Sequence, residues 1–205
     1  MPSERFVIEL KKFLDTPERR EWKGLDVGCG PHIGILAEYG LDAAPISTFV
    51  NPDYPREKFT QGNVYKMPFE DNSFDYVVSA HLIEHLKRRT KALKEMVRVA
   101  RHVVIANVPR YTRDKKVAED PCVRLDFYYF SAFPEKMEKY GLTREDFDIW
   151  SPGATTFDGL DAHHCAWFPH PKNMIKLFNK AGCFTKVRSE VCPGNCGETN
   201  TFGWL

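Results

Sequence analysis

The sequence predicts an α/β fold whose sheet is mostly parallel and is covered by helices on both faces. Short apolar strands alternate with amphipathic helices along the chain, and this alternation is typical of such sheets. The 205 residues are the length of a single domain, and 42% of them are hydrophobic, so the chain can bury a sizeable core. No internal repeat or long linker divides it, and we expect one domain over residues 1–205.

The composition excludes several classes of protein. Lys and Arg number 29 and Asp and Glu number 28, so bulk charge does not support binding to nucleic acid or an anionic membrane. No apolar run approaches the ~18 residues that span a bilayer. The first residues lack the apolar core of a signal peptide, and the six cysteines are too scattered for a secreted disulfide framework. These features predict a cytoplasmic protein.

The N-terminal half of the chain supplies one helix and four strands. A helix begins after Ser3, its predicted N-cap, and a first strand starts at Gly24 and breaks into a glycine turn. An apolar piece over residues 35–41 ends at Asp42. Two further strands are predicted over residues 59–64 and 74–79. The helix is predicted from apolar residues spaced at i, i+4, i+7 and i+8, which are Phe6, Leu10, Phe13 and Leu14.

The second half continues the alternation around one long interruption. A helix with Thr90 as its N-cap is predicted over the apolar residues Leu93, Met96, Val97 and Ala100. A strand over residues 102–107 follows and stops before Pro109. The same helical spacing recurs at Met174, Leu177, Phe178 and Ala181, with Gly182 just past the helix end. Strands over residues 184–191 and 201–205 complete the chain.

The interruption is residues 110–162, which are rich in aromatic and charged side chains. A connection this long is more often functional than a plain loop, so we expect an insert that carries substrate or lid residues. A satellite core packed on the sheet is an equal alternative. The core is then divided into residues 24–107 and residues 163–205, its C-terminal part.

The glycine turn Gly28-Cys-Gly30 follows a predicted strand directly, where a backbone without side chains can approach a ligand. A dinucleotide site would have a third glycine where Ile33 stands. Asp26 lies just before the turn, and its carboxylate would repel a pyrophosphate and attract a cation. The turn therefore predicts a ligand that is positively charged or carries an amine.

Two long motifs indicate that the glycine turn is part of a ligand site and is not an ordinary tight turn. Leu25-Asp-Val-Gly-Cys-Gly-Pro31 resembles the first motif of class I S-adenosylmethionine-dependent methyltransferases, of the short methyltransferase-11 type. Gly62-Asn-Val-Tyr-Lys-Met-Pro-Phe-Glu-Asp-Asn-Ser-Phe-Asp-Tyr-Val77 and Ser79-Ala-His-Leu-Ile-Glu-His-Leu86 look like the next signature. The resemblance covers residues 24–107 and, weakly, 164–191. It implies a Rossmann-like methyltransferase fold with an insert before the last helix, and S-adenosylmethionine as cofactor.

The resemblance also implies which residues hold the cofactor. Asp26 and the turn residues Gly28, Cys29 and Gly30 would receive the methionine part. Asp42 would bind the ribose diol. If a normal helix fills residues 32–44, Asn51 or Asp53 would take that role instead.

The adenine end of the cofactor falls to the next strand ends. Asn63 would accept a hydrogen bond from the adenine amino group, although it could equally be a turn residue. Val64 would pack against the base. Ala80 and His81, after the fourth strand, would line the site.

Methyl transfer requires the acceptor to be aligned and sometimes deprotonated. His81 and His163 are the candidate groups for this chemistry, and His81 could act as a base or orient the substrate. The text His-x-x-Glu-His over residues 81–85 matches an inverted zinc-protease motif, which requires a long helix of its own. A cluster of Cys192 and Cys196 with His163 and His164 lacks a second tight pair, so we predict no metal site.

The resemblance therefore implies methyl transfer, and the near-neutral charge favours a small-molecule or glycan acceptor over nucleic acid. No Asn-Pro-Pro-Tyr type motif follows the fourth strand, and this favours an oxygen acceptor. A non-catalytic methyltransferase-like binding or partner module is the alternative. A nicotinamide-dependent oxidoreductase is disfavoured by Asp26 and by the missing third glycine.

Overall fold

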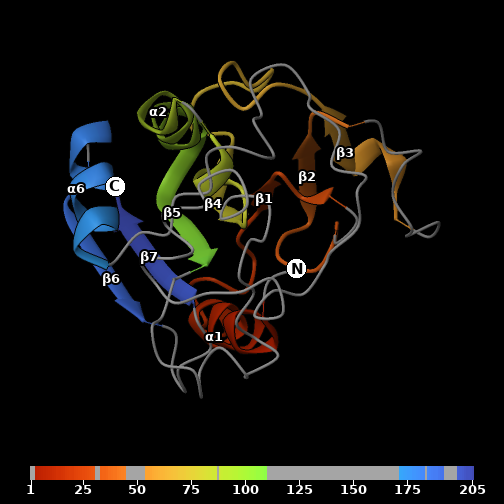
Figure 1. The fold of residues 1–205 in the computed structure, drawn as a ribbon. Helices are drawn as coiled ribbons and strands as arrows, with labels where there is room; N and C mark the ends of the chain where they lie inside the picture. The colour runs from red at the N-terminus through yellow and green to blue at the C-terminus, as the bar shows by residue number, and fades with distance from the viewer. Residues whose placement is uncertain are drawn as a thin grey trace, which may run out of the picture.

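The computed structural model describes residues 3–30, 33–44, 54–86, 88–109, 171–182, 184–191 and 198–205. The strands described in these ranges form one sheet in the order β3-β2-β1-β4-β5-β7-β6 (Figure 1). The strands are β1 (Gly24–Val27), β2 (Tyr39–Asp42), β3 (Phe59–Gln61), β4 (Phe74–Ala80), β5 (Ala100–Pro109), β6 (Lys186–Val191) and β7 (Glu198–Trp204). The helices are α1 (Glu4–Leu14), α2 (Arg89–Val99) and α6 (Pro171–Ala181), with short 3-10 turns η3 (Arg56–Lys58) and η4 (Ile83–His85).

The sheet is parallel from β3 to β5, as predicted, and β7 alone runs against its neighbours. Because β7 is antiparallel to β5, its first residue, Glu198, pairs with Pro109 at the carboxyl end of β5. The start of β7 therefore lies at the same edge as the ends of β1, β2 and β4. In open α/β sheets this edge is where ligands bind.

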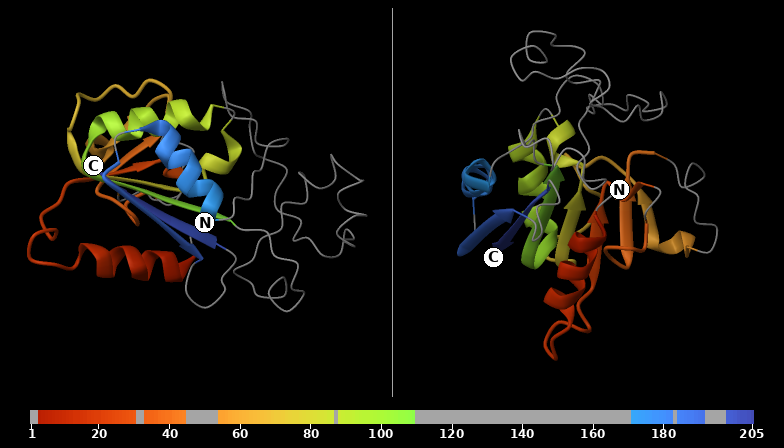
Figure 2. Two further views of the ribbon diagram at one scale, coloured as in Figure 1. Left: turned by 90° about the vertical axis from the view of Figure 1, so that its left-hand side faces the viewer. Right: turned by 60° about the horizontal axis from the view of Figure 1, so that its bottom comes forward.

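Helices cover both faces of the sheet, with α1 on one side and α2 and α6 on the other (Figure 2, left). The larger core lies under α2 and α6 and contains fully buried Leu93, Met96, Met174 and Phe178. The packing of an apolar helix face on each side confirms the predicted layers.

The N-terminal helix α1 begins as predicted. The Ser3 side chain accepts a hydrogen bond of 3.2 Å from the Phe6 N–H and so caps the helix. Phe6 and Leu10, one turn apart, are buried against Val78 and Ile105 of the central strands.

The connection from β1 to β2 is short, and its described residues, 28–30 and 33–38, contain no α-helix. The N-terminal helix α1 packs beside this connection, against Leu36 and Ala37. It thus covers a face that would otherwise be left open. Since β2 spans Tyr39–Asp42, a helix over residues 32–44 is wrong and the strand ends at Asp42. Asn51 and Asp53 lie outside the described residues.

Several predicted boundaries are corrected. Arg88 and not Thr90 precedes α2, because the Arg88 carbonyl accepts the first hydrogen bonds of the helix, from Lys91 and Ala92. Ala100 begins β5 and does not end α2. The third strand stops at Gln61 because Asn63 to Lys66 form a turn.

At the C-terminal side, β7 starts earlier than predicted and β6 two residues later. Helix α6 ends as expected, where Gly182 has a φ of 85° and donates its N–H to the Phe178 carbonyl. None of the described helices is both long enough and apolar enough to span a membrane.

Candidate active site

The glycine turn after β1 is enclosed by a neighbouring side chain at Gly28 and has open space beside Gly30. Gly28 has a φ of 75°, and a Cβ added there would lie 2.9 Å from Leu82 Cδ2. Gly30 has a φ of 50°, and a Cβ added there would meet nothing within 4 Å. Both positions therefore suit glycine, but only Gly28 is enclosed by its neighbours. The space beside Gly30 is open to a ligand.

Asp42, the last residue of β2, holds this turn in place. Its Oδ2 accepts a hydrogen bond of 2.9 Å from the Gly30 N–H, and its Oδ1 accepts one of 2.9 Å from the Ala44 N–H. A carboxylate oxygen has two acceptor sites, so each oxygen retains one. The side chain is half-buried, which leaves these sites at the edge of the sheet.

Asp26 is buried in β1 next to the turn and lacks a full set of partners. The residue is 2% exposed, and its Oδ1 has no hydrogen-bond partner in the part of the chain that the structure describes. Burial and, to a smaller extent, the charge of Asp42 raise the pKa of Asp26 to about 8. The carboxyl therefore holds a proton at neutral pH unless a cation approaches it.

Cys29 contributes packing to the turn. Its side chain is 4% exposed and lies in a small cluster with Ile33 and Tyr54. A Cβ added at Gly40 would lie 2.9 Å from the Cys29 sulfur. Burial, followed by the charges of Asp26 and Asp42, raises the pKa of the Cys29 thiol. A thiol in this environment is a small apolar side chain and a poor nucleophile.

The residues after β3 form a turn. Asn63 is exposed, and its Oδ1 accepts a hydrogen bond of 2.8 Å from the Tyr65 N–H, as a turn residue does. One acceptor site of this oxygen remains. Val64 is 9% exposed and packs in the larger core.

The end of β4 carries a strained histidine. Ala80 is the last residue of β4 and is 9% exposed. His81 follows with a φ of 54°, a backbone angle that residues other than glycine rarely adopt. Its backbone N–H donates to the Asn107 carbonyl at 2.9 Å. Residues held in this region cluster at functional sites.

Glu198 joins His81 to two other parts of the chain. The Glu198 carboxylate is buried and lies 3.0 Å from His81 Nε2 and 2.9 Å from Asn107 Nδ2. Ser3 donates its backbone N–H and its hydroxyl to the two Glu198 oxygens. Burial raises the pKa of Glu198, but the hydrogen bonds from His81, Ser3 and Asn107 outweigh it and lower that pKa.

Sequence reasoning missed Glu198, Asn107 and Ser3 as parts of this edge. Their positions are far apart in the chain, and none belongs to a periodic pattern. The available signal is the polar run Glu198-Thr-Asn-Thr201 in a strand whose first six residues are all buried. Polar side chains that are buried throughout a strand need partners.

Several other candidates are not placed by the structure. His163, His164, Cys192, Cys196 and the insert over residues 110–162 lie outside the described residues. Within the described residues, no group of three or more His, Cys, Asp or Glu side chains could hold a metal ion. The text His-x-x-Glu-His does not lie on a long helix, because η4 spans only Ile83–His85 and His81 precedes it.

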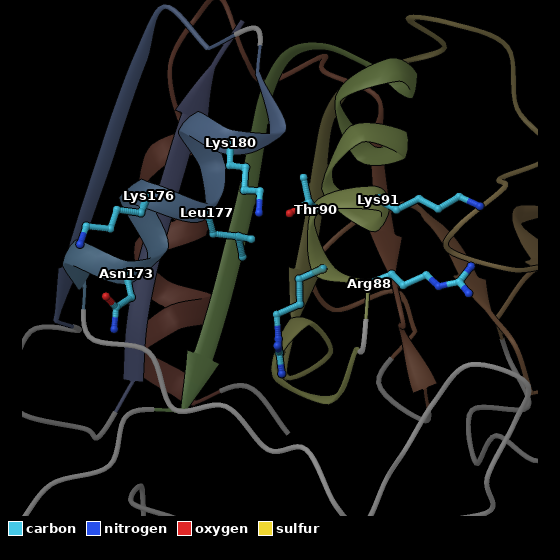
Figure 3. A pocket seen from close by; sticks show the side chains of 8 residues that line it. Arg88, Thr90, Lys91, Asn173, Lys176, Leu177 and Lys180 are labelled. Carbon is cyan, nitrogen blue, oxygen red and sulfur yellow. The ribbon is translucent and has the colours of Figure 1, made fainter.

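A groove of about 740 Å³ lies between α2 and α6 and is lined by basic side chains. In Figure 3 the side chains of Arg88 and Lys91 extend away from α6. Arg89 donates to the carbonyls of Ile83 and Glu84. These cations do not converge on one point, so we do not include the groove in the candidate site.

Comparison with known proteins relates part of the chain to methyltransferases. Residues 25–104 match the family described as "Methyltransferase domain". Ajmaline N-methyltransferase of Rauvolfia serpentina is 32% identical over 106 residues, which are 43% of this chain and 36% of that protein. The matched part spans less than half the length of such curated relatives.

Solved structures resemble the chain over nearly its whole length. An S-adenosylmethionine-dependent methyltransferase from Mesorhizobium loti has a TM-score of 0.56 at 12% identity and covers 99% of both chains. Magnesium protoporphyrin IX methyltransferase from Synechocystis, solved with bound SAH, has a TM-score of 0.55 at 11% identity and covers 98% of this chain and 83% of that one. The sheet order and these neighbours show that the chain has the fold of class I S-adenosylmethionine-dependent methyltransferases, and its residues 25–104 are similar to their methyltransferase domain.

Proposed function

We propose that the chain transfers a methyl group from S-adenosylmethionine to a small-molecule acceptor. The observation that carries the proposal is the buried carboxyl of Asp26, whose Oδ1 lacks a hydrogen-bond partner among the described residues. Such an atom costs about 1–3 kcal/mol unless a ligand satisfies it. It lies at the carboxyl end of β1 beside the open space at Gly30, where the family match also falls.

The donor set fits the methionine part of this cofactor. An ammonium group beside Asp26 would favour its ionised form and supply the missing hydrogen bond. The open space beside Gly30 would accommodate the amino-acid part of the methionine group. Asp42 retains one acceptor site on each oxygen, which suits a ribose diol.

The adenine end is assigned to residues after β3 and β4. Asn63 retains an acceptor site for an amino group, and the buried Val64 supplies an apolar contact. Ala80 and His81 close the site from the end of β4.

The same turn is poorly suited to a nicotinamide dinucleotide. A pyrophosphate is bound by free backbone N–H groups at a glycine-rich turn. Here the N–H groups of Gly28 and Cys29 donate to the Leu41 carbonyl, and that of Gly30 donates to Asp42. The three donors are engaged within the protein, and two carboxyl groups lie beside them. An oxidoreductase of this kind is therefore disfavoured.

The cofactor supplies an activated methyl group: the acceptor's lone pair forms the new bond to the methyl carbon while the C–S bonding pair returns to sulfur. The protein has to align the acceptor and take its proton where one is released. His81, at the carboxyl end of β4, is the group we assign to the proton. An oxygen acceptor stays a prediction, since Ajmaline and Norajmaline N-methyltransferases are named for methylation at nitrogen.

Two measurements test the proposal. Calorimetric titration with S-adenosylhomocysteine should give micromolar binding that Asp26→Ala weakens at least tenfold. An assay of S-adenosylhomocysteine release over alcohols, phenols, sugars and amines then identifies the acceptor. No binding by a folded wild-type protein would overturn the proposal. Binding without turnover over the whole panel would favour a non-catalytic module.

A further inference from the structure

The carboxylate of Glu198 lies beside His81 and belongs to none of the residues assigned to the cofactor. It receives hydrogen bonds from four donors that come from three segments. Oε1 lies 3.1 Å from the Ser3 N–H nitrogen and 3.0 Å from His81 Nε2. Oε2 lies 2.5 Å from Ser3 Oγ and 2.9 Å from Asn107 Nδ2. Four donors fill the four acceptor sites of an ionised carboxylate.

This geometry determines which ring nitrogen of His81 carries the proton. Because an ionised Glu198 can only accept, Nε2 has to be the donor. In the neutral ring, Nδ1 is then the atom with the free lone pair. Nδ1 lies 3.9 Å from Glu84 Oε1, which is too long for a hydrogen bond. Nδ1 therefore stays available to accept a proton.

Burial and charge around the ring are consistent with a base. The His81 side chain is 20% exposed, whereas those of Glu84 and Glu198 are 1% and 3% exposed. The carboxyl groups of Glu84 and Glu198 lie 3.9 Å from Nδ1 and 3.0 Å from Nε2 of the ring, respectively. A proton taken by Nδ1 leaves Nε2 as the donor of a charge-assisted hydrogen bond to the Glu198 carboxylate.

The backbone supports the same arrangement. Asn107 accepts the His81 N–H with its carbonyl and donates its Nδ2 to Glu198 Oε2 and to Asn200 Oδ1. One residue of β5 thus fixes both the strained backbone of His81 and the carboxylate that orients its ring. Ser3, which caps α1, holds the other side of Glu198.

We propose that Glu198, held by Ser3 and Asn107, is a positioning residue that keeps the His81 proton on Nε2 and so makes Nδ1 the base of the methyl-transfer reaction. The inference rests on the proposed function. In the step, the acceptor's proton moves to His81 Nδ1 as the acceptor's electron pair forms the bond to the methyl carbon. The bonding pair to sulfur leaves with S-adenosylhomocysteine, and the proton later returns to solvent.

The first readout needs no acceptor. We would record the ¹⁵N signals of the His81 ring at a pH where it is neutral, in wild type and Glu198→Ala, and assign them by their loss in His81→Asn. Asparagine tolerates the positive φ, so this variant keeps the backbone. We expect a proton on Nε2 in the wild type and a mixture of tautomers in Glu198→Ala. A wild-type ring protonated on Nδ1 would overturn the proposal.

The second readout is turnover together with cofactor affinity. Glu198→Gln has one acceptor oxygen for four donors, so we expect kcat to fall about 10²-fold, the range of a general base. S-adenosylhomocysteine affinity should change less than threefold. Glu198→Asp should recover part of the lost kcat. Glu190→Gln is the matched control, because the side chain of this half-buried residue of β6 pairs with Arg188 and not with the residues around His81 in the described part of the chain.

The outcomes separate the two proposals. No S-adenosylhomocysteine binding by folded wild type counts against the methyltransferase function. An unchanged kcat in Glu198→Gln, with normal binding, counts against the role of Glu198 alone. If Glu198→Ala does not fold, Glu198→Gln provides the ring signals, and an unchanged tautomer with an unchanged kcat overturns the positioning role.

Discussion

The backbone N–H of Gly30 donates a hydrogen bond of 2.9 Å to Oδ2 of Asp42, so the glycine turn after β1 is fastened to the end of β2. Asp42 is also bonded to the Ala44 N–H through its other oxygen. The turn and the strand end therefore form one unit, and a ligand that touches both meets a fixed geometry.

Replacing Asp42 should affect both stability and cofactor binding. In Asp42→Ala the N–H groups of Gly30 and Ala44 lose their acceptor, and we expect the free energy of unfolding to fall by about 1–3 kcal/mol. S-adenosylhomocysteine binding should weaken in parallel. Urea unfolding and calorimetry measure the two effects. Asp15→Ala is the control, since the Asp15 carboxylate forms an exposed ion pair with Arg20 and does not bond the turn. Normal binding by a stable Asp42→Ala would contradict the ribose role.

Comparing substitutions at two glycines with positive φ distinguishes the effect of backbone strain from that of lost ligand contact. Gly30 and Gly182 both have positive φ, and a Cβ at either would meet nothing within 4 Å. We expect Gly30→Ala and Gly182→Ala to lose a similar free energy of unfolding, about 1–2 kcal/mol. Only Gly30→Ala should weaken S-adenosylhomocysteine binding, by tenfold or more. Equal affinity in the two variants would show that the space at Gly30 receives no ligand.

Binding at Asp26 should release a proton. With a pKa of about 8, the free carboxyl is about 90% protonated at pH 7, and an ammonium ligand favours its ionised form. Calorimetric titration with S-adenosylhomocysteine in phosphate and in Tris should therefore give different apparent enthalpies. The difference corresponds to nearly one proton released. Asp26→Asn should show weaker binding and no such release. Identical wild-type enthalpies in both buffers would argue against an ammonium beside Asp26.

The same carboxyl should make stability depend on pH. Its pKa is raised from 3.8 to about 8, so between these values the folded state holds a proton that the unfolded state has lost. The free energy of unfolding therefore falls as the pH rises through this window. We expect the difference between wild type and Asp26→Asn, measured by urea unfolding from pH 5 to pH 9, to shift against the wild type with increasing pH. A constant difference would contradict the raised pKa.

The packing of α1 predicts a contrast between two of its apolar residues. Phe6 is fully buried against the sheet, whereas Ile8 is 42% exposed. Phe6→Ala should lower the free energy of unfolding by about 3–5 kcal/mol, and Ile8→Ala should change it little. Thermal and urea unfolding measure both. A small effect of Phe6→Ala would mean that α1 does not hold the sheet face beside the β1–β2 connection.

Much of the fold follows from local patterns in the sequence. The spacing of Phe6 and Leu10 with Ser3 before them predicts α1, and Asp26 followed by two glycines predicts the turn. These signals are local because a helix repeats every 3.6 residues and a turn needs few positions. The predicted N-cap of α2 is wrong. Thr90 is a residue type that often caps helices, but the helix begins one residue before it, at Arg89.

The polar edge around His81 could not be predicted in the same way. Glu198 meets Ser3, His81 and Asn107 only because β7 runs antiparallel beside β5 and α1 returns to that edge. Their separations in sequence are 195, 117 and 91 positions. No local pattern encodes such a meeting. It depends on sheet order, which the periodicity of single elements does not specify.

The bond between Ser3 and Glu198 also bears on how the protein is made. A ribosome adds about 5–20 residues per second, and contacts between distant positions form late because closing a long loop loses chain entropy. Ser3 must therefore remain without this partner until residue 198 has been synthesised. The apolar face of α1 can settle on the central strands earlier, whereas the edge around His81 is completed only when the last strand arrives. A competent His81 therefore has to wait until β7 has joined the sheet.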